Sequence, residues 1–198
     1  MRLFIWIIII LLGVNQFLIG SLIPQAVGID IQTEEAGELS SEIIPSGVPE
    51  VYGTELGINY DGVRPEDPQL ADQTIAVLAQ LDQDINLQGE DLNRYIDILY
   101  YQYEGISCEY CCGARAVIFE DGEMACGCAH SYAMRGLAKY LILEHGGEMT
   151  DEEILTEVGK WKVLFFPGAH IQKAAIMQEQ GIEVNYISLT TNINRGIN

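Results

Sequence analysis

The sequence has few basic residues and few cysteines. Lys and Arg account for 10 of the 198 residues, against 29 Asp and Glu, so the formal net charge is −19. A chain this acidic repels phosphate backbones, which excludes nucleic acid as an expected partner. Five cysteines are too few for a disulfide-stapled miniprotein, and their odd number means that disulfides alone cannot use them all. The composition also excludes collagen-like, coiled-coil and multi-span membrane classes.

Motifs that would identify an enzyme are missing as well. The sequence contains no Ser-His-Asp series, no glycine-rich phosphate loop and no pair of carboxylates with an assignable role. It therefore favours a binding protein over an enzyme, and it identifies no protein partner.

A long apolar run stands at the start of the chain. Leu3–Ile23 is interrupted by only three polar residues, and as a helix it would span roughly 31 Å, the thickness of a bilayer's hydrocarbon core. Neither a small-residue cleavage site nor a lipobox cysteine follows, so we expect residues 1–28 to form an uncleaved signal anchor, with a cleaved signal peptide as the alternative. Arg2 precedes the run and acidic residues follow it. This predicts a single-pass membrane protein with a cytoplasmic N-terminus and an extracytoplasmic C-terminal domain.

An acidic segment follows the apolar run. Residues 29–66 contain recurring Pro, Gly and carboxylates without a periodic apolar face, which predicts a flexible tether. Residues 29–104 hold 17 acidic and 2 basic side chains. Solvation and repulsion from the anionic membrane surface explain this excess better than a calcium site does.

The remaining residues, 67–198, are predicted to form a mostly helical domain. Gly136, inside one apolar helix pattern, indicates close packing against a neighbouring element. The first two predicted helices, over about 68–83 and 90–103, are expected to form a helical hairpin. Apolar spacing and capping signals predict helices over about 68–83, 90–103, 131–145, from the capping box at Thr150–Glu153 onward and over 169–180, followed by a strand at Ile182–Leu189.

All five cysteines fall within 21 residues, in the pattern C-x2-C-C-x13-C-x-C-x-H. Asp121-Gly122, between two apolar runs, predicts a two-residue hairpin turn with Val117 opposite Cys126. Such a hairpin, within 106–130, would bring both cysteine groups together, as in a zinc knuckle or ribbon. The predicted fold class is therefore mainly α, with a small β-hairpin carrying a Cys/His cluster and an N-terminal transmembrane helix.

The residue types in this cluster favour a transition metal. Thiolates with an imidazole suit Zn²⁺, our first choice for a closed structural site, and Cu⁺ is the alternative. An iron–sulfur cluster fits less well because the spacing matches neither common ferredoxin run. The predicted ligands are Cys108, Cys111, Cys126, Cys128 and His130, with Cys112 and Met134 as additional candidates.

Two interpretations without a metal use the same residues. The pairs in C-E-Y-C and C-G-C can act as a dithiol redox couple, with one thiol activated at a helix N-terminus near Cys128. Alternatively, two disulfides and one thiol staple a small interaction domain.

The cysteine motifs resemble those of one group of proteins. Ser107–Gly113 (SCEYCCG) and Ala125–Ser131 (ACGCAHS) are similar to segments of uncharacterised membrane-anchored cysteine-rich proteins of archaeal and uncultured lineages, over about Ser46 to Ile193. The chain is loosely similar to lipoproteins with a P-C-Y-C-G-C motif, which also carry a helical Glu-Ile pair, here Glu153-Ile154. It lacks their lipobox and proline-led motif. The resemblance implies an extracytoplasmic, metal-binding domain and no particular reaction.

Overall fold

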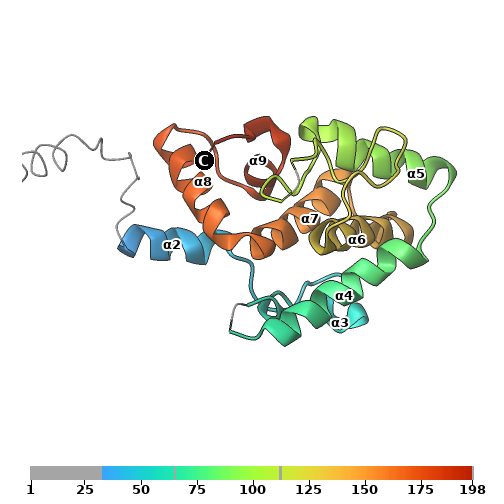
Figure 1. Cartoon of the computed structure of the whole chain (residues 1–198), viewed down its shortest axis with the longest axis horizontal. Coiled ribbons are helices and arrows are strands. Elements are labelled where there is room, and N and C mark those ends of the chain that lie inside the picture. Colours follow the sequence, from blue (N-terminus) through green and yellow to red (C-terminus); the bar gives the residue numbers. More distant parts are fainter. Residues whose placement is uncertain (1–32, 65, 112, 198) are drawn as a thin grey trace, which may run out of the picture. The chain divides into compact units, whose positions relative to one another are not determined.

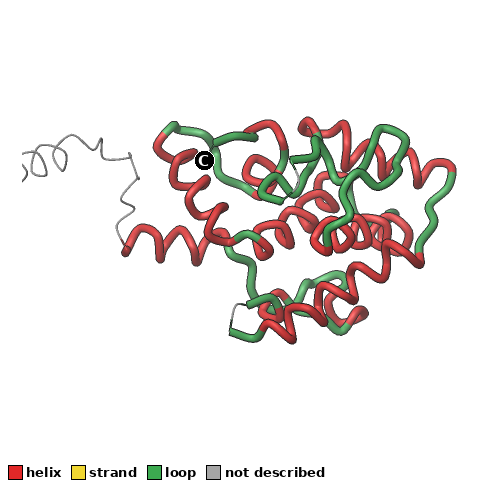
Figure 2. The backbone as a smooth tube through the Cα atoms, viewed as in Figure 1, coloured by secondary structure: helices red, strands yellow, loops and turns green. Residues whose placement is uncertain are grey.

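The computed structural model (Figure 1) describes residues 33–64, 66–111 and 113–197. Helices make up most of the described chain and irregular loops join them, as Figure 2 shows. In chain order the elements are α2 (Thr33–Ile43), α3 (Gly53–Leu56), η1 (Tyr60–Gly62), α4 (Pro68–Asp84), α5 (Gly89–Ile96), the π-helical turn η2 (Asp97–Tyr101), η3 (Gln102–Glu104), α6 (Ala129–His145), α7 (Asp151–Phe165), α8 (Pro167–Glu179), α9 (Tyr186–Thr190) and η4 (Asn192–Asn194).

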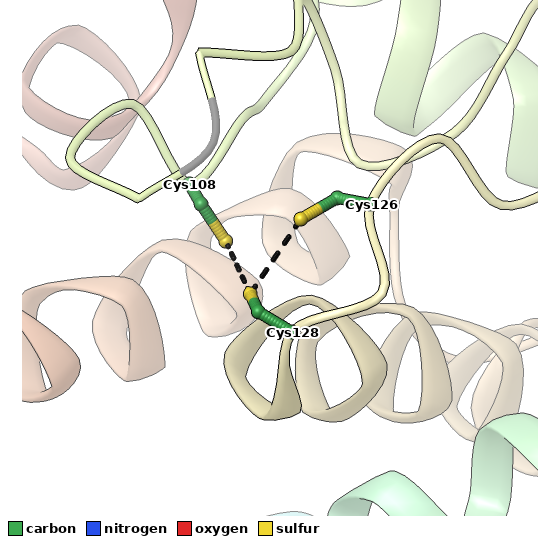
Figure 3. Close-up of side chains that lie close together, drawn as sticks. All are labelled: Cys108, Cys126 and Cys128. Carbon is green, nitrogen blue, oxygen red and sulfur yellow. Dashed lines mark hydrogen bonds between the residues drawn. The ribbon is translucent and has the colours of Figure 1, made fainter.

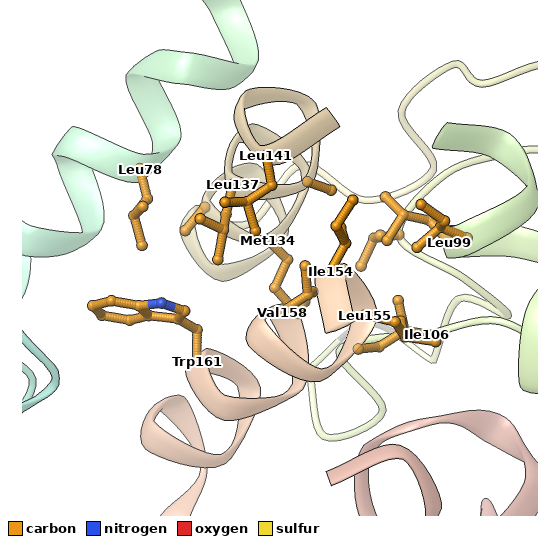
Figure 4. Close-up of a cluster of buried hydrophobic side chains, with 14 of the residues drawn as sticks. Leu78, Leu99, Ile106, Met134, Leu137, Leu141, Ile154, Leu155, Val158 and Trp161 are labelled. Carbon is orange, nitrogen blue, oxygen red and sulfur yellow. The ribbon is translucent and has the colours of Figure 1, made fainter. Parts of the chain in front are cut away.

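The main core forms around α6, which packs against both α4 and α7. Leu78 of α4, Leu137 of α6 and Trp161 of α7 are fully buried and face the same cluster (Figure 4). Burying one large apolar side chain stabilises a fold by about 1.5–3 kcal/mol. The apolar faces of these helices therefore contribute substantially to the stability of the domain.

The helices α4 and α6 approach each other at Gly136. A Cβ added there would lie 2.0 Å from the Leu78 carbonyl oxygen and 2.8 Å from the Asp82 amide nitrogen. No side chain fits at that distance, so only glycine allows the two backbones to come this close. The prediction of close packing at Gly136 is confirmed.

Two predicted helix starts are also confirmed. The Asp67 carboxylate accepts a hydrogen bond from the Leu70 N–H at 3.0 Å and caps α4, whose first residue is a proline. At α7, Thr150 Oγ1 accepts from the Glu153 N–H at 3.3 Å, and the Glu153 carboxylate accepts from the Thr150 N–H at 2.7 Å. This reciprocal pair is a capping box, which satisfies two N–H groups that the helix itself leaves unpaired.

Part of the segment predicted to be a flexible tether is folded against these helices. Leu39 and Ile43 of α2 are buried in a second cluster that includes residues of α8. Tyr52, which precedes α3, is fully buried, accepts a hydrogen bond from Trp161 Nε1 at 2.7 Å and donates one to Glu157 at 3.0 Å. The acidic composition of this segment thus coexists with ordered contacts to α7 and α8.

The predicted fold class is wrong in its β component. The described residues form no strand, only two isolated antiparallel bridges, Ile106–Thr191 and Ile118–Met124. Backbone hydrogen bonds do cross the turn, from the Phe119 N–H to the Glu123 carbonyl at 2.7 Å and from the Ala125 N–H to the Val117 carbonyl at 3.2 Å, but they place Ile118 opposite Met124 in place of the predicted Val117–Cys126 pair. The pairing does not extend beyond this one bridge, since the Val117 N–H donates to the Ile106 carbonyl at 2.9 Å, and the rest of the segment forms a loop.

Three further predictions concern the arrangement of elements. The strand predicted at Ile182–Leu189 is wrong, because its second half begins helix α9. The first two helices do not pair mainly with each other: α4 packs chiefly on α6.

The transmembrane helix predicted within residues 1–28 lies outside the described residues, and no helix in the described part is long and apolar enough to cross a membrane.

Candidate metal centre

Three cysteine sulfurs lie close together where the 105–128 loop meets α6 (Figure 3). The Sγ atoms of Cys108, Cys126 and Cys128 all lie within 4.8 Å of one another. Cys128 Sγ is 3.4 Å from Cys108 Sγ and 3.6 Å from Cys126 Sγ. Cys108 and Cys126 are 1% and 6% exposed. In the described part of the chain, no other group of three or more Cys, His, Asp or Glu side chains is close enough to hold a metal ion.

The N-terminus of α6 positions Cys128. This residue is the N-cap, and its Sγ accepts a hydrogen bond from the Ser131 N–H at 3.4 Å. Ser131 Oγ lies 2.9 Å from Cys108 Sγ and 3.4 Å from Cys128 Sγ, so the serine contacts two of the three sulfurs. Because a helix N-terminus carries partial positive charge, negative charge on these sulfurs is favoured there.

Arg135 positions Cys126. Its guanidinium, 1% exposed, donates from Nη1 to the Cys126 carbonyl at 2.8 Å and to the Val117 carbonyl at 3.2 Å. The same group forms an ion pair with Asp82 of α4, with Nε donating at 2.9 Å. One buried arginine therefore joins both arms of the loop to α4 and α6.

Glu109, the residue after Cys108, holds the start of the loop in place. Glu109 has a positive φ of 48°, a conformation that side chains rarely adopt, and its carboxylate lies among buried cations. Lys162 Nζ is 3.3 Å and Lys173 Nζ is 3.5 Å from Glu109 Oε2, and both lysine side chains are fully buried. Burial raises the pKa of the Glu109 carboxyl, but the two ammonium groups outweigh this effect and lower the pKa overall. Glu109 is therefore an anionic anchor that ties the Cys108 segment to α7 and α8.

The C-terminal segment completes the support of the loop. Asn192 Nδ2 donates to the Glu104 carbonyl at 2.8 Å and to the Arg115 carbonyl at 2.7 Å. Its backbone N–H donates to the Gly105 carbonyl at 2.9 Å, and Ser107 Oγ donates to Asn192 Oδ1 at 3.2 Å. Side-chain hydrogen bonds thus replace the missing ladder of backbone pairs.

Burial sets the protonation of the donors. Burial raises the pKa of the Cys108 thiol well above its ordinary value, and the contact with Ser131 offsets only part of this shift. Cys108 alone is therefore a neutral thiol at neutral pH, and a bound cation is what would displace its proton. Burial also lowers the pKa of His130, which keeps its imidazole neutral, the form that binds metals.

The predicted ligands are only partly brought together. Cys108, Cys126 and Cys128 form the group, whereas Cys111 is an exposed residue of the same loop outside it. The His130 ring packs against Phe165 and Phe166, with centroids 4.7 and 5.0 Å away. Met134 is fully buried in the helical core, and Cys112 lies outside the described residues.

The sequence reasoning missed the charged residues that hold the loop. Apolar spacing predicts helices but does not indicate which charged residues are buried. The buried or ion-paired charged residues here are Arg135, Lys162, Lys173 and Glu109. A signal was present in the run Trp161–Phe166, where a lysine interrupts buried apolar residues. A charged side chain at a core position needs a partner, so such an interruption marks a buried ion pair.

The chain matches no protein-family model, no curated protein and no solved structure. The site is therefore interpreted from its own residues. Three cysteine thiols, two of them buried, held by a helix N-terminus, an arginine and an ion-paired carboxylate, can hold a metal ion.

Proposed function

We propose that this protein binds one Zn²⁺ through Cys108, Cys126 and Cys128 and that the ion has a structural role. The sulfur spacing carries this proposal. With Zn–S bonds of about 2.3 Å, tetrahedral geometry places two sulfurs about 3.8 Å apart. The two sulfur–sulfur separations in the structure, 3.4 and 3.6 Å, are close to that value and far beyond the roughly 2 Å of a disulfide bond.

Charge and burial favour zinc over copper. Three thiolates around Zn²⁺ leave one net negative charge, whereas around Cu⁺ they leave two. Because Cys108 and Cys126 are buried, each additional uncompensated charge costs desolvation free energy. The divalent ion is therefore the better fit to this donor set.

The fourth zinc position goes to His130 in this proposal. The residue lies in the first turn of α6, two positions after Cys128, and its neutral imidazole is partly buried. Cys111, the other remaining predicted donor, is exposed. His130→Ala is expected to weaken zinc binding more than Cys111→Ser.

The positions of the three cysteines along the chain support a structural role for the ion. The loop has almost no regular backbone pairing, and the three cysteines lie near its start, at its end and at the N-cap of α6. An ion bound there would cross-link the start of the loop to its end and the adjoining first turn of α6, so metal binding and folding would be coupled.

Metal analysis of the full-length protein tests this proposal. The chain is purified without added metal or reductant and analysed by inductively coupled plasma mass spectrometry, and its thiols are titrated before and after denaturation with a chelator. We expect one zinc per chain and at least three thiols that react only after both treatments. Cys126→Ser should lose the zinc and melt at a lower temperature. Ala125→Ser, which introduces the same side chain one position away, should keep both properties.

A redox function is the second candidate, favoured by one contact. Cys128, at the N-cap of a 17-residue helix, lies 3.4 Å from Cys108 Sγ, near enough for the two to form a disulfide after a small movement. This candidate predicts a metal-free protein in which Cys126→Ser folds normally and Cys128→Ser abolishes thiol–disulfide exchange. Zinc in the purified protein, with loss of folding in Cys126→Ser, would exclude it.

A further inference from the structure

A cavity of about 550 Å³ lies between the C-terminal end of α4, α5, α6 and the turn at 121–124. Pockets that bind small organic molecules have volumes of about 300–1,000 Å³. The cavity is separate from the three sulfurs, since none of the cysteines lines it.

One wall of the cavity carries a buried network of charges. Asp82, with 7% of its side chain exposed, pairs with Arg135 at 2.8 Å and with Lys139 at 2.7 Å. Lys139 Nζ also donates to the Asp82 carbonyl at 2.7 Å. Two cations face one carboxylate, so this wall has one net positive charge.

Tyr95, in the same wall, has an unmade hydrogen bond. The side chain is 1% exposed, and its Oη is buried without a hydrogen-bond partner among the described residues. Burial, followed by the nearby Asp82 carboxylate, raises the pKa of Tyr95, so the hydroxyl keeps its proton and acts as a donor. A buried donor without an acceptor costs free energy, and a ligand oxygen in the cavity would supply that acceptor.

The rest of the lining mixes apolar and polar side chains, with two acidic residues. Leu87 is buried, Leu92 is partly buried, and the exposed Met124 side chain also lines the space. Asp121 and Glu123 are exposed lining residues. These two carboxylates bring the lining as a whole to one net negative charge, which disfavours phosphates and other polyanions most strongly, whereas the apolar residues favour a ligand with a hydrocarbon body.

We propose that this cavity binds a small organic monocarboxylate with an apolar chain or ring. The carboxylate accepts the hydrogen bond of Tyr95 Oη and is neutralised by the excess positive charge of Arg135 and Lys139. The hydrocarbon body lies over Leu87 and Leu92. No cysteine lines this site, but it shares Arg135 with the support of the proposed zinc centre.

Calorimetric titration of the full-length protein tests the proposal, with hexanoate and phenylacetate as probes, and with hexanamide and inorganic phosphate as comparison ligands. We expect one or both acids to bind saturably at millimolar concentrations or below, and hexanamide and phosphate to bind at least about tenfold more weakly. Tyr95→Phe removes only the hydroxyl. It should weaken binding of the acid about tenfold, the effect of losing one hydrogen bond to a charged group.

Tyr186→Phe is the matched control, because it removes a tyrosine hydroxyl from α9, which contributes no residue to the lining of the cavity. It should leave the affinity unchanged, and circular dichroism should be the same for both variants and the wild type. Absence of saturable binding by both acids would overturn the proposal. Equal affinity for the acid and its amide, equal affinity for phosphate, or an unchanged affinity in Tyr95→Phe would overturn it as well.

Discussion

The helical core and the 105–128 loop share one apolar cluster, which Ile106, Val117 and Ile118 of the loop join, but the loop is also held by interactions of a different kind. In the core, fully buried apolar side chains of α4, α6 and α7 meet around residues such as Leu137 and Trp161. In the loop, backbone carbonyls accept hydrogen bonds from buried polar side chains, chiefly Arg135 and Asn192. Apolar contacts in the core stabilise the fold without requiring one exact geometry, because substitutions there that conserve volume cost little free energy. The loop is built for position, because each hydrogen bond requires a defined geometry.

This difference has a consequence for mutation. Damage to the core should lower global stability while the folded molecules keep an intact thiol centre. Damage to the side chains that hold the loop should lower stability and also displace the three sulfurs from one another. Stability and metal affinity, measured on the same variants, separate the two effects.

The largest effect is expected from Arg135→Met. The change removes the donors to Cys126 and Val117 and leaves the buried Asp82 carboxylate with Lys139 as its remaining partner. Loss of one partner of a buried ion pair costs about 3–5 kcal/mol. Urea denaturation should show that loss, and a chromophoric chelator should show weaker zinc binding. Arg115→Met, which removes an exposed arginine of the same loop, should change both by far less.

Gly136→Ala probes the core in the same helix. The added Cβ would meet backbone atoms of α4 at 2.0 and 2.8 Å, so α4 and α6 must separate. We expect a loss of about 3 kcal/mol, at the upper end for overpacking, and a much smaller loss of zinc affinity in the folded fraction than in Arg135→Met. Gly168→Ala in α8, where a Cβ meets nothing within 4 Å, serves as the control and should be neutral or slightly stabilising. A parallel loss of zinc affinity in Gly136→Ala would contradict the separation of the two regions.

A third prediction concerns His170, which lies next to the loop. Its Nδ1–H donates to the Phe166 carbonyl at 2.9 Å, and its ring meets Tyr110 edge-on at 5.3 Å. Burial, followed by the positive charge of Lys162, lowers the pKa of His170 to about 3, from 6.5. Between these values the unfolded chain binds one more proton than the folded one, so stability falls as the pH falls below 6.5.

The variant His170→Asn isolates this effect, because the amide can still donate to the Phe166 carbonyl. Between pH 6.5 and pH 5, the wild type should lose about 2 kcal/mol more than the variant. Urea denaturation at each pH measures both curves, and their difference removes the contributions that the two proteins share, including acid loss of metal. Parallel curves would mean that His170 takes up a proton without unfolding.

The smallest effect is expected from Thr150→Ala. It removes the hydroxyl of the capping box at α7, which should cost about 1 kcal/mol. Differential scanning calorimetry should show a modestly lower melting temperature with unchanged zinc content. Thr54→Ala, an exposed threonine in α3, is the control. A loss of zinc in Thr150→Ala would show that the start of α7 helps to form the thiol centre.

The regular part of the fold could be predicted because its signals are local. Apolar spacing and the caps at Asp67 and Thr150 indicated where helices begin, and Gly136 indicated close packing. Apolar segments at 33–62 were overlooked because frequent acidic residues hide the few buried positions, such as Leu39 and Tyr52. Their burial depends on partners in α7 and α8, which are distant in the sequence.

The thiol centre could be predicted in part. Clustered cysteines identified three residues that do meet, but the expected hairpin does not form. The Asp121-Gly122 turn is a local signal, whereas the competing interactions come from far along the chain. The Ile106 carbonyl takes the Val117 N–H, and Arg135 takes the Cys126 carbonyl. Turn preference alone carries no information about such acceptors and donors.

The sulfur of Cys128 both caps α6 and belongs to the cluster of three cysteine sulfurs. Fraying of the first turn of α6 therefore opens the centre, and an ion bound to the sulfur would hold that turn closed. Local opening of a helix end exposes its amides to exchange with solvent deuterium. The hydrogen-exchange rate of the Ser131 amide thus measures how often the first turn of α6 opens at the site, separately from global unfolding.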